Sequence, residues 1–348
     1  MKRLLPFFLL LGACATPRPV PTPAVTEAEM RSTMSVLAGD AFEGRMAGTA
    51  GEMKAAAYIA GRFRAAGLRP AGGGFLQGFK VDREPTAIPG EAIKLPSAQR
   101  HFIGEMNKRG PFTAHNVVGQ VAGQAPDGRA VVVMAHYDHL GICRPDGAPD
   151  RICNGAVDNA SGVAALITVA ERVAKMKLDR DVWFVATSAE EWGLLGAKAF
   201  ADRPPLPLNA IIAGFNLDTI AIAAKGAPVA MLGTKGSALE LLVREAALAA
   251  GRAWDGDNEA ASFLKRQDGW ALAERGVPMI MAGGSFSNMK QFEAFLAAAY
   301  HDPEDELRPN TELGGAVEDA NLHVELVRRA ASRSILPSFA RVPQISGH

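Results

Sequence analysis

Carboxylate and imidazole side chains follow several apolar runs of this chain, and their residue types suit metal binding. A mixed set of histidine and carboxylate ligands without a thiolate favours zinc or another borderline divalent ion, and a carboxylate can bridge two ions. Two ions about 3.5–4 Å apart can hold a hydroxide and stabilise a tetrahedral intermediate. The chemistry these residues could perform is therefore metal-assisted hydrolysis. The candidates are His136, Asp138, Asp158, Glu190, Glu191, Asp218 and His301.

Asp158 and the pair Glu190–Glu191 suggest which residues could bind metal and which could act as the general base. Asp158 lies in a polar, glycine-bounded loop that opens a helix, and it is the bridging candidate. Neighbouring side chains do not share a direction, so one of the two glutamates can ligate while the other acts as general base. Taken alone, such a pair is usually a solvated helix start, and a lone histidine is usually a surface or core group. The combination of residue type, order and position outweighs those readings.

The elements that must position these residues alternate between apolar strands and helices. This alternation predicts an α/β fold with three layers, α-β-α, around a central mixed, mostly parallel sheet. Ligands bind outside the carboxyl ends of strands in such sheets, which is where the candidates occur. The expected strands are 117–121, 130–135, 182–187, 211–217 and 277–282, and the expected helices are 162–176, 194–201, 237–250, 289–300 and 322–335.

The remaining chain is assigned less sharply. Residues 27–75 have mostly a helical pattern with a stop at Gly67. Residues 70–113 are rich in proline and glycine, and this region could be irregular, hold edge strands or form a small insertion. With no repeat and no second interior linker, residues 27–340 are expected to form one domain.

Composition excludes several classes of protein. The chain has 348 residues, 48% of them hydrophobic, which excludes a disordered chain, collagen and a disulfide miniprotein. Lys plus Arg and Asp plus Glu number 37 each, so no charge surplus indicates a nucleic-acid partner. The longest apolar run, 4–11, is too short to span a bilayer.

The N-terminus is typical of an export signal. Lys2 and Arg3 precede the apolar run, and small residues lead to Cys14. We expect residues 1–13 to be a signal peptide and Cys14 to be lipidated, as in bacterial lipoproteins; an ordinary secretory signal is the alternative. The proline-rich residues 14–26 would form an extended tether. The protein is therefore expected to be exported and lipid-anchored in the bacterial cell envelope, facing the periplasm, with no other membrane contact.

Export affects how the remaining two cysteines are interpreted. Cys143 and Cys153 are separated by nine residues rich in Pro, Gly and Asp. In an oxidising compartment they are good disulfide candidates. A pair of thiolate metal ligands is the less favoured alternative, because this gap is not a zinc-ribbon spacing.

Five ordered motifs resemble one family. The chain resembles the co-catalytic zinc aminopeptidases of the twenty-eighth metallopeptidase family, which also contains glutamate carboxypeptidases and glutaminyl cyclases. The resemblance covers about residues 35–330, and an upstream segment at 37–49 is similar to bacterial members. The motifs are His136-Tyr137-Asp138-His139, Asp158-Asn159-Ala160-Ser161-Gly162, Glu190-Glu191-Trp192-Gly193, Asn216-Leu217-Asp218 and Tyr300-His301.

The resemblance implies two zinc ions, peptide substrates and a role for each candidate. His136, Asp158 and Asp218 would bind one zinc ion, and Asp158, Glu191 and His301 the other. Glu190 would be the general base. Asp138 would orient the first histidine through its other ring nitrogen, and His139 would be structural.

One departure from the family pattern affects substrate preference. Many members carry a Ser-Asp-His triplet before the strand at 277, but this chain has Gln267-Asp268-Gly269, preceded by Arg266. The leading function is a zinc aminopeptidase. The alternatives are a carboxypeptidase, for which Arg266 could hold the substrate carboxylate, a glutaminyl cyclase, and a non-catalytic binding lipoprotein. The oligomeric state is left open.

Overall fold

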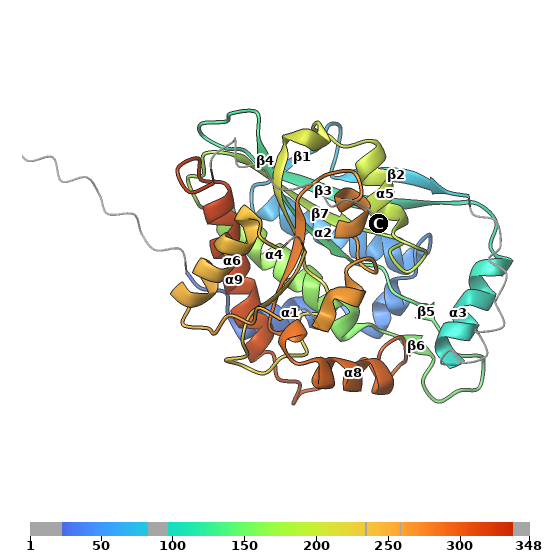
Figure 1. The fold of residues 1–348 in the computed structure, drawn as a ribbon. Helices are drawn as coiled ribbons and strands as arrows, with labels where there is room; N and C mark the ends of the chain where they lie inside the picture. Colours follow the sequence, from blue (N-terminus) through green and yellow to red (C-terminus); the bar gives the residue numbers. More distant parts are fainter. Residues whose placement is uncertain (1–22, 83–96, 234, 258, 337–348) are drawn as a thin grey trace, which may run out of the picture.

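The computed structural model describes residues 23–82, 97–233, 235–257 and 259–336 (Figure 1). The predicted signal peptide, Cys14, most of the predicted tether and the last four residues of the predicted domain lie outside the described residues. Within the described part of the chain, no helix has both the length and the apolar character needed to cross a membrane.

A mixed sheet lies at the centre, with the strand order β1-β3-β7-β4-β8-β10-β9 and with β2 paired to β3. The four central strands β7, β4, β8 and β10 run parallel, while the outer pairings are antiparallel. The predicted α/β fold is confirmed, and the parallel part of the sheet is its centre. The strands are β1 (Arg69–Pro70), β2 (Leu76–Val81), β3 (Phe112–Val121), β4 (Ala130–His136), β7 (Asp181–Thr187), β8 (Ile211–Asn216), β9 (Ala230–Leu232) and β10 (Met279–Gly283).

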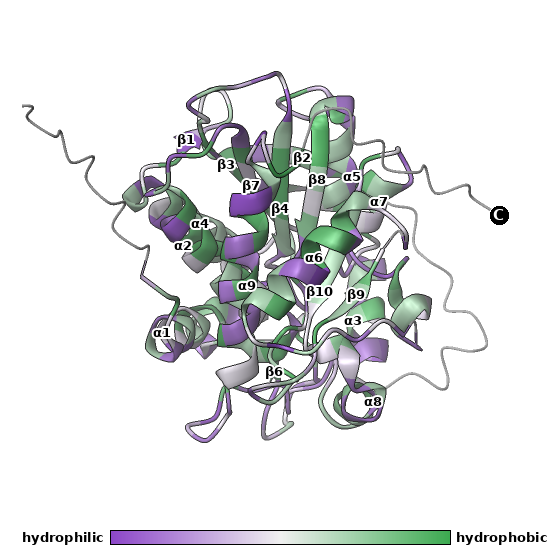
Figure 2. Ribbon diagram, turned by 60° about the vertical axis from the view of Figure 1, so that its left-hand side comes forward, coloured by the Kyte–Doolittle hydropathy of each residue, from purple (hydrophilic) through white to green (hydrophobic). Residues whose placement is uncertain are grey.

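Helices cover both faces of this sheet, which explains why its central strands are apolar throughout. Every residue of β4 is buried; Val131 and Val133 pack into one apolar cluster and Val132 and Met134 into another. Figure 2 shows α2 and α4 on one side of the sheet and α5 and α7 on the other. The first layer is α1 (Glu27–Leu37), α2 (Ala50–Ala65), α4 (Ser161–Val173), α6 (Ala238–Ala249) and α9 (Gly314–Ala330), and the second is α5 (Leu195–Asp202) and α7 (Gly269–Ala273).

Three smaller elements lie near the carboxyl ends of the parallel strands. A two-stranded hairpin, β5 (Gly141–Ile142) and β6 (Ile152–Cys153), is closed by a disulfide between Cys143 and Cys153, whose Cα atoms are 5.7 Å apart. Helix α3 (Ser97–Lys108) packs near this hairpin, and α8 (Met289–Ala298) lies beside the end of β10.

Two of the helix predictions are wrong in their bounds. The helical pattern at 27–75 is two helices, separated by a turn in which Glu43, Gly44 and Arg45 all have positive φ. Helix α9 begins at Gly314, eight residues before the predicted start. A Cβ on Gly315 would lie 2.0 Å from the Ala223 carbonyl oxygen, so this glycine permits close packing and does not mark a loop.

The proline- and glycine-rich region 70–113 holds an edge strand, β2, which is one of the predicted alternatives. It contains β2, α3 and the first residues of β3, which extends the sheet beyond β7. Residues 83–96 of this region lie outside the described residues.

Candidate active site

The parallel strands bring the first three candidate ligands together at their carboxyl ends. His136 is the last residue of β4, and Asp218 follows the neighbouring strand β8. The His136 Nε2 atom lies 3.2 Å from Asp158 Oδ1 and 3.5 Å from Asp218 Oδ1. All three side chains are buried, so these donors are held away from bulk water.

A second group of donors lies on the other side of Asp158. The His301 Nε2 atom is 3.3 Å from Asp158 Oδ2 and 3.0 Å from Glu191 Oε2. The two carboxylate oxygens of Asp158 thus face two different histidines, Oδ1 toward His136 and Oδ2 toward His301. This is the arrangement that a carboxylate bridging two cations requires.

His139 also lies in this second group. Its Nδ1 atom is 3.0 Å from Glu191 Oε1 and 3.8 Å from Asp158 Oδ2, and its ring meets that of His301 edge to face. Burial lowers the pKa of His139 despite these carboxylates. A neutral His139 can donate one hydrogen bond through Nδ1 and so orient Glu191.

The carboxylates around the site attract positive charge. Burial alone lowers the pKa of His136, but Asp218 and Asp158 outweigh it and hold that pKa well above its ordinary value. Burial also lowers the pKa of His301, but Glu191 and Asp158 raise it to about 10. Cations bound between these groups would displace the imidazole protons, as metal binding to histidine requires, and would supply the positive charge in their place. The donors therefore fit divalent metal ions.

Glu190 and Glu191 diverge as predicted for adjacent residues. Glu191 faces the two histidines described above, while Glu190 lines the cavity beside His136 and Asp218. Burial, together with Glu191 and Asp268, raises the pKa of Glu190 well above its ordinary value, although His136 opposes this effect. A carboxyl group with a raised pKa suits proton transfer near neutral pH.

The Asp138 carboxylate was expected to orient the His136 ring, but it lies closer to the backbone of the Glu190–Glu191 pair. Its carboxylate accepts hydrogen bonds from the backbone amides of Glu190, at 3.0 Å, and Glu191, at 3.4 Å. The His136 Nδ1 atom lies 3.3 Å from the Asp138 backbone oxygen and 3.8 Å from its carboxylate. The main chain of Asp138 is therefore the closer partner of the ring, and its side chain positions the glutamate pair.

Two residues for which the sequence predicted no role hold the ligands in place: Asp305, which sequence reasoning missed, and Tyr300, which it named only as part of a motif. Asp305 accepts hydrogen bonds from the amides of Val157 and Asp158, and its pKa is raised to about 7 by burial, which these amides partly offset. Tyr300 stacks on His301 with ring centroids 3.7 Å apart. Asp305 follows His301 closely in the sequence, which is the one local signal that could have indicated it.

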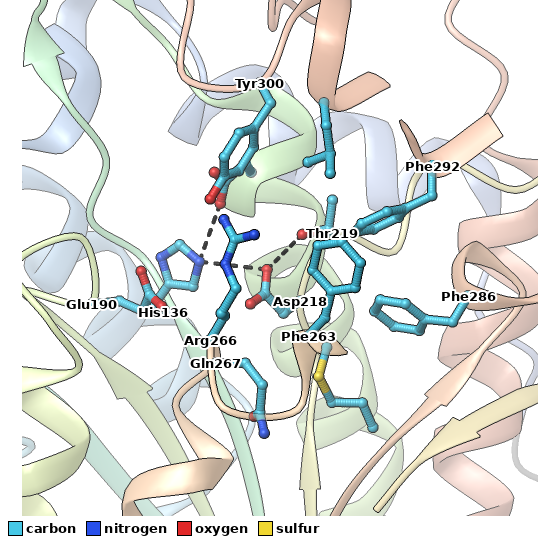
Figure 3. Close-up of a pocket in the computed structure, with 13 residues that line it drawn as sticks. His136, Glu190, Asp218, Thr219, Phe263, Arg266, Gln267, Phe286, Phe292 and Tyr300 are labelled. Atoms are coloured by element: carbon cyan, nitrogen blue, oxygen red, sulfur yellow. Dashed lines mark hydrogen bonds and ion pairs between the residues drawn. The ribbon is translucent and has the colours of Figure 1, made fainter. Parts of the chain in front are cut away.

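A cavity opens beside the metal donors (Figure 3). One end is lined by His136, Asp158, Glu190 and Asp218, and the other by apolar side chains. Arg266 rises from the loop below and points between these two ends toward Tyr300. The apolar lining consists of Phe263, Met281, Phe286, Phe292 and Leu296.

The family triplet departs from its pattern inside this cavity wall. Gln267 lines the cavity, and its Oε1 accepts the Gly269 amide at 2.7 Å. Asp268 is buried and accepts a hydrogen bond from the hydroxyl of Thr187. Burial raises the pKa of Asp268 to about 6, and His136 opposes this rise. Asp268, the aspartate of the triplet, is therefore part of the site, and Gly269 stands where the family pattern has the histidine.

Comparison with known sequences identifies relatives. The alkaline phosphatase isozyme conversion protein of Escherichia coli K12 is 27% identical over 202 residues, which is 56% of this chain and 51% of that protein. Aminopeptidase YwaD of Bacillus subtilis is 28% identical over 149 residues, 42% of this chain and 30% of that protein. The chain thus spans about half or less of the length of these relatives.

Solved structures show the same fold. A zinc aminopeptidase from Bacillus subtilis superposes with a TM-score of 0.64 at 17% identity, covering 94% of this chain and 100% of that one. A glutaminyl cyclase from Fimbriiglobus ruber has a TM-score of 0.61 at 19% identity, covering 90% of this chain and 99% of that one. Residues 116–324, from β3 to within α9, match the model of peptidase family M28. This match covers more than half of the chain, which therefore belongs to peptidase family M28.

Proposed function

We propose that this protein is a dizinc aminopeptidase that removes N-terminal residues from peptides. The observation that carries the proposal is the position of Asp158, whose two oxygens face two separate histidines. His136, Asp158 and Asp218 would hold one zinc ion. Glu191 and His301, together with the second oxygen of Asp158, would hold the other.

His301 is a better ligand for the second ion than His139. The His301 Nε2 atom lies close to both Asp158 and Glu191, at 3.3 and 3.0 Å, whereas His139 approaches only Glu191 closely. We therefore assign His139 to orienting Glu191.

The chain's own residues would transfer the protons. When bound, zinc ions supply Lewis acidity that polarises the scissile carbonyl and lowers the pKa of the attacking water. Glu190 takes a proton from that water and later delivers it to the leaving amine. Asp138 fixes the Glu190 backbone during both transfers through its hydrogen bond to the amide. Burial raises the pKa of Tyr300, so its hydroxyl stays protonated and can donate a hydrogen bond within the cavity.

A Glu190→Gln variant tests this assignment. The full chain would be purified in detergent and loaded with zinc. The wild type is expected to hold about two zinc ions per chain and to release amino acids from free-amine peptides but not from N-acetylated ones. Glu190→Gln should keep its zinc and lose about 10²–10⁴-fold in kcat. The exposed Glu274→Gln is the matched control. Unchanged kcat in Glu190→Gln would remove the proposed base, and release from N-acetylated peptides would favour a carboxypeptidase.

We further propose that the protein is exported and anchored by a lipid on Cys14, with the catalytic region facing the periplasm. The buried disulfide between Cys143 and Cys153 is consistent with an oxidising compartment. Cys14→Ser is expected to move the protein from the membrane fraction to the soluble periplasmic fraction. Retention of this variant in the membrane fraction would exclude the anchor.

A further inference from the structure

The cavity beside the metal donors contains a cation that the proposed hydrolysis does not use. Arg266 lines the cavity together with Glu190 and Asp218. Among the residues that the structure describes, its guanidinium forms no hydrogen bond or ion pair. It lies 5.3 Å from the centroid of the Phe263 ring. Arginine carries five N–H donors in a fork that matches a carboxylate, so this side chain is available for an anionic ligand.

The backbone that carries Arg266 is fixed. The Arg266 amide donates to the Phe263 carbonyl at 3.0 Å. The buried side chain of Gln267 then spans the turn, donating to the Leu264 carbonyl at 3.0 Å and accepting from the Gly269 amide at 2.7 Å. Arg266 is itself exposed, but its side chain rises toward Tyr300 and the metal donors (Figure 3).

The position of Arg266 limits which carboxylate it can bind. Arg266 shares one cavity with the proposed base, so its anionic ligand must lie close to the bond that is cleaved. In a dipeptide, the terminal carboxylate is about one residue, or about 3.5 Å, from the scissile carbonyl, and each further residue moves it away by a similar step. The apolar end of the cavity, which includes Phe286 and Phe292, suits an apolar or aromatic side chain.

We propose that Arg266 binds the free α-carboxylate of dipeptides whose first residue is apolar or aromatic, and that this protein is therefore a dipeptide-selective enzyme. The inference rests on the proposed aminopeptidase function. It makes Arg266 a specificity-determining residue: it contacts the substrate carboxylate and takes no part in proton transfer.

The test compares a dipeptide with its amide. The zinc-loaded full chain in detergent would be assayed with phenylalanyl-alanine and with phenylalanyl-alanine amide, which lacks the terminal charge. A charge-assisted hydrogen bond to substrate predicts that the wild type prefers the free acid by about 10-fold to 100-fold in kcat/KM. Arg266→Gln should bring this ratio close to one, mainly by raising KM for the free acid. Arg266→Lys should retain part of the preference.

Lys265→Gln is the matched control. Lys265 is the neighbouring exposed cation, but it contacts the Trp270 ring, at 5.2 Å, and does not line the cavity. This variant is expected to keep the wild-type ratio. A similar loss of the ratio in both variants would overturn the proposal, because it would reflect net charge and not a specific contact.

Other outcomes are equally decisive. Equal kcat/KM on the acid and the amide in the wild type would overturn the proposal while leaving the aminopeptidase function intact. An Arg266-dependent preference for glutamyl-alanine amide over phenylalanyl-alanine amide would also overturn it, by assigning the guanidinium to a first-residue side chain. If the zinc-loaded wild type hydrolyses neither peptide, the proposed function itself fails.

Discussion

Arg45 is expected to be a residue outside the metal site whose loss strongly destabilises the protein. Its side chain is completely buried, although its pKa, lowered to about 10 by burial, leaves it charged at neutral pH. Its N–H groups donate to four backbone carbonyls: Leu37 at 2.5 Å, Tyr137 and Asn154 at 2.7 Å each, and Gly155 at 3.1 Å. These carbonyls belong to the end of α1, the loop after β4 and the loop that leads to Asp158.

The size of the effect follows from these contacts. Arg45→Met keeps the length of the side chain but leaves the Leu37, Tyr137 and Asn154 carbonyls without a donor, while the Gly155 carbonyl still accepts the Ala160 amide. At about 1 kcal/mol for each of these three carbonyls, the lower limit for an orphaned buried acceptor, the free energy of unfolding should fall by at least about 3 kcal/mol. Arg45→Lys keeps the charge and can serve three carbonyls at most, so it should cost less.

Urea unfolding of the metal-free protein would measure this loss, with the zinc content of the folded variants as a second readout. Zinc affinity should fall with stability, because the Asn154 and Gly155 carbonyls fix the loop that carries Asp158. The exposed Arg69→Met is the matched control and should change stability by less than about 0.5 kcal/mol. A loss below about 1 kcal/mol in Arg45→Met would refute the reasoning, since water would then be serving these carbonyls.

Two further predictions concern stability. Burial lowers the pKa of His323 to about 4 from its ordinary 6.5, so between these values the unfolded chain binds a proton that the folded chain does not, and stability falls as the pH drops through this window. Between pH 7 and pH 5, the free energy of unfolding measured in urea should therefore fall by about 2 kcal/mol less in His323→Phe than in the wild type. An equal fall in the two proteins would contradict this prediction. Replacing Cys143 and Cys153 by serine should cost just under about 3 kcal/mol, and a thiol reductant should then destabilise the wild type but not the variant.

The central sheet and the metal donors could be predicted because both leave local signals. A strand covered on both faces must be apolar at every position, as the fully buried β4 is. His136 and Asp218 end or follow such strands, and parallel strands bring their carboxyl ends to one edge. Asp158 and His301 lack this signal: Asp158 is a candidate because of its polar, glycine-bounded loop and His301 because it follows a predicted helix, and only the resemblance assigns each of them to a particular ion.

The supporting residues could not be predicted because their partners are distant in sequence. Arg45 contacts carbonyls that are 92 to 110 residues away, except for Leu37. Asp305 holds amides 147 and 148 residues away. In a polar segment, a buried arginine or aspartate looks the same in the sequence as an exposed loop residue, and only tertiary contacts distinguish the buried residue from the exposed one. The same reason explains the predicted late start of α9, where Asp319 is buried against Arg252, 2.6 Å away.

Gly269, which stands where the family triplet has a histidine, packs closely against the Gln267 side chain. A Cβ at Gly269 would lie 2.7 Å from Gln267 Oε1 and 3.4 Å from Asn216 Cβ, so the Gln267 side chain excludes any larger residue at 269 in its present position. That same Gln267 oxygen accepts the Gly269 amide and fixes the turn below Arg266. Restoring a histidine at 269 would therefore require Gln267 to move, which would release the turn that directs Arg266 into the cavity. Gly269 and Gln267 thus support one arrangement, in which Arg266 lines the cavity beside the metal donors and no histidine follows Asp268.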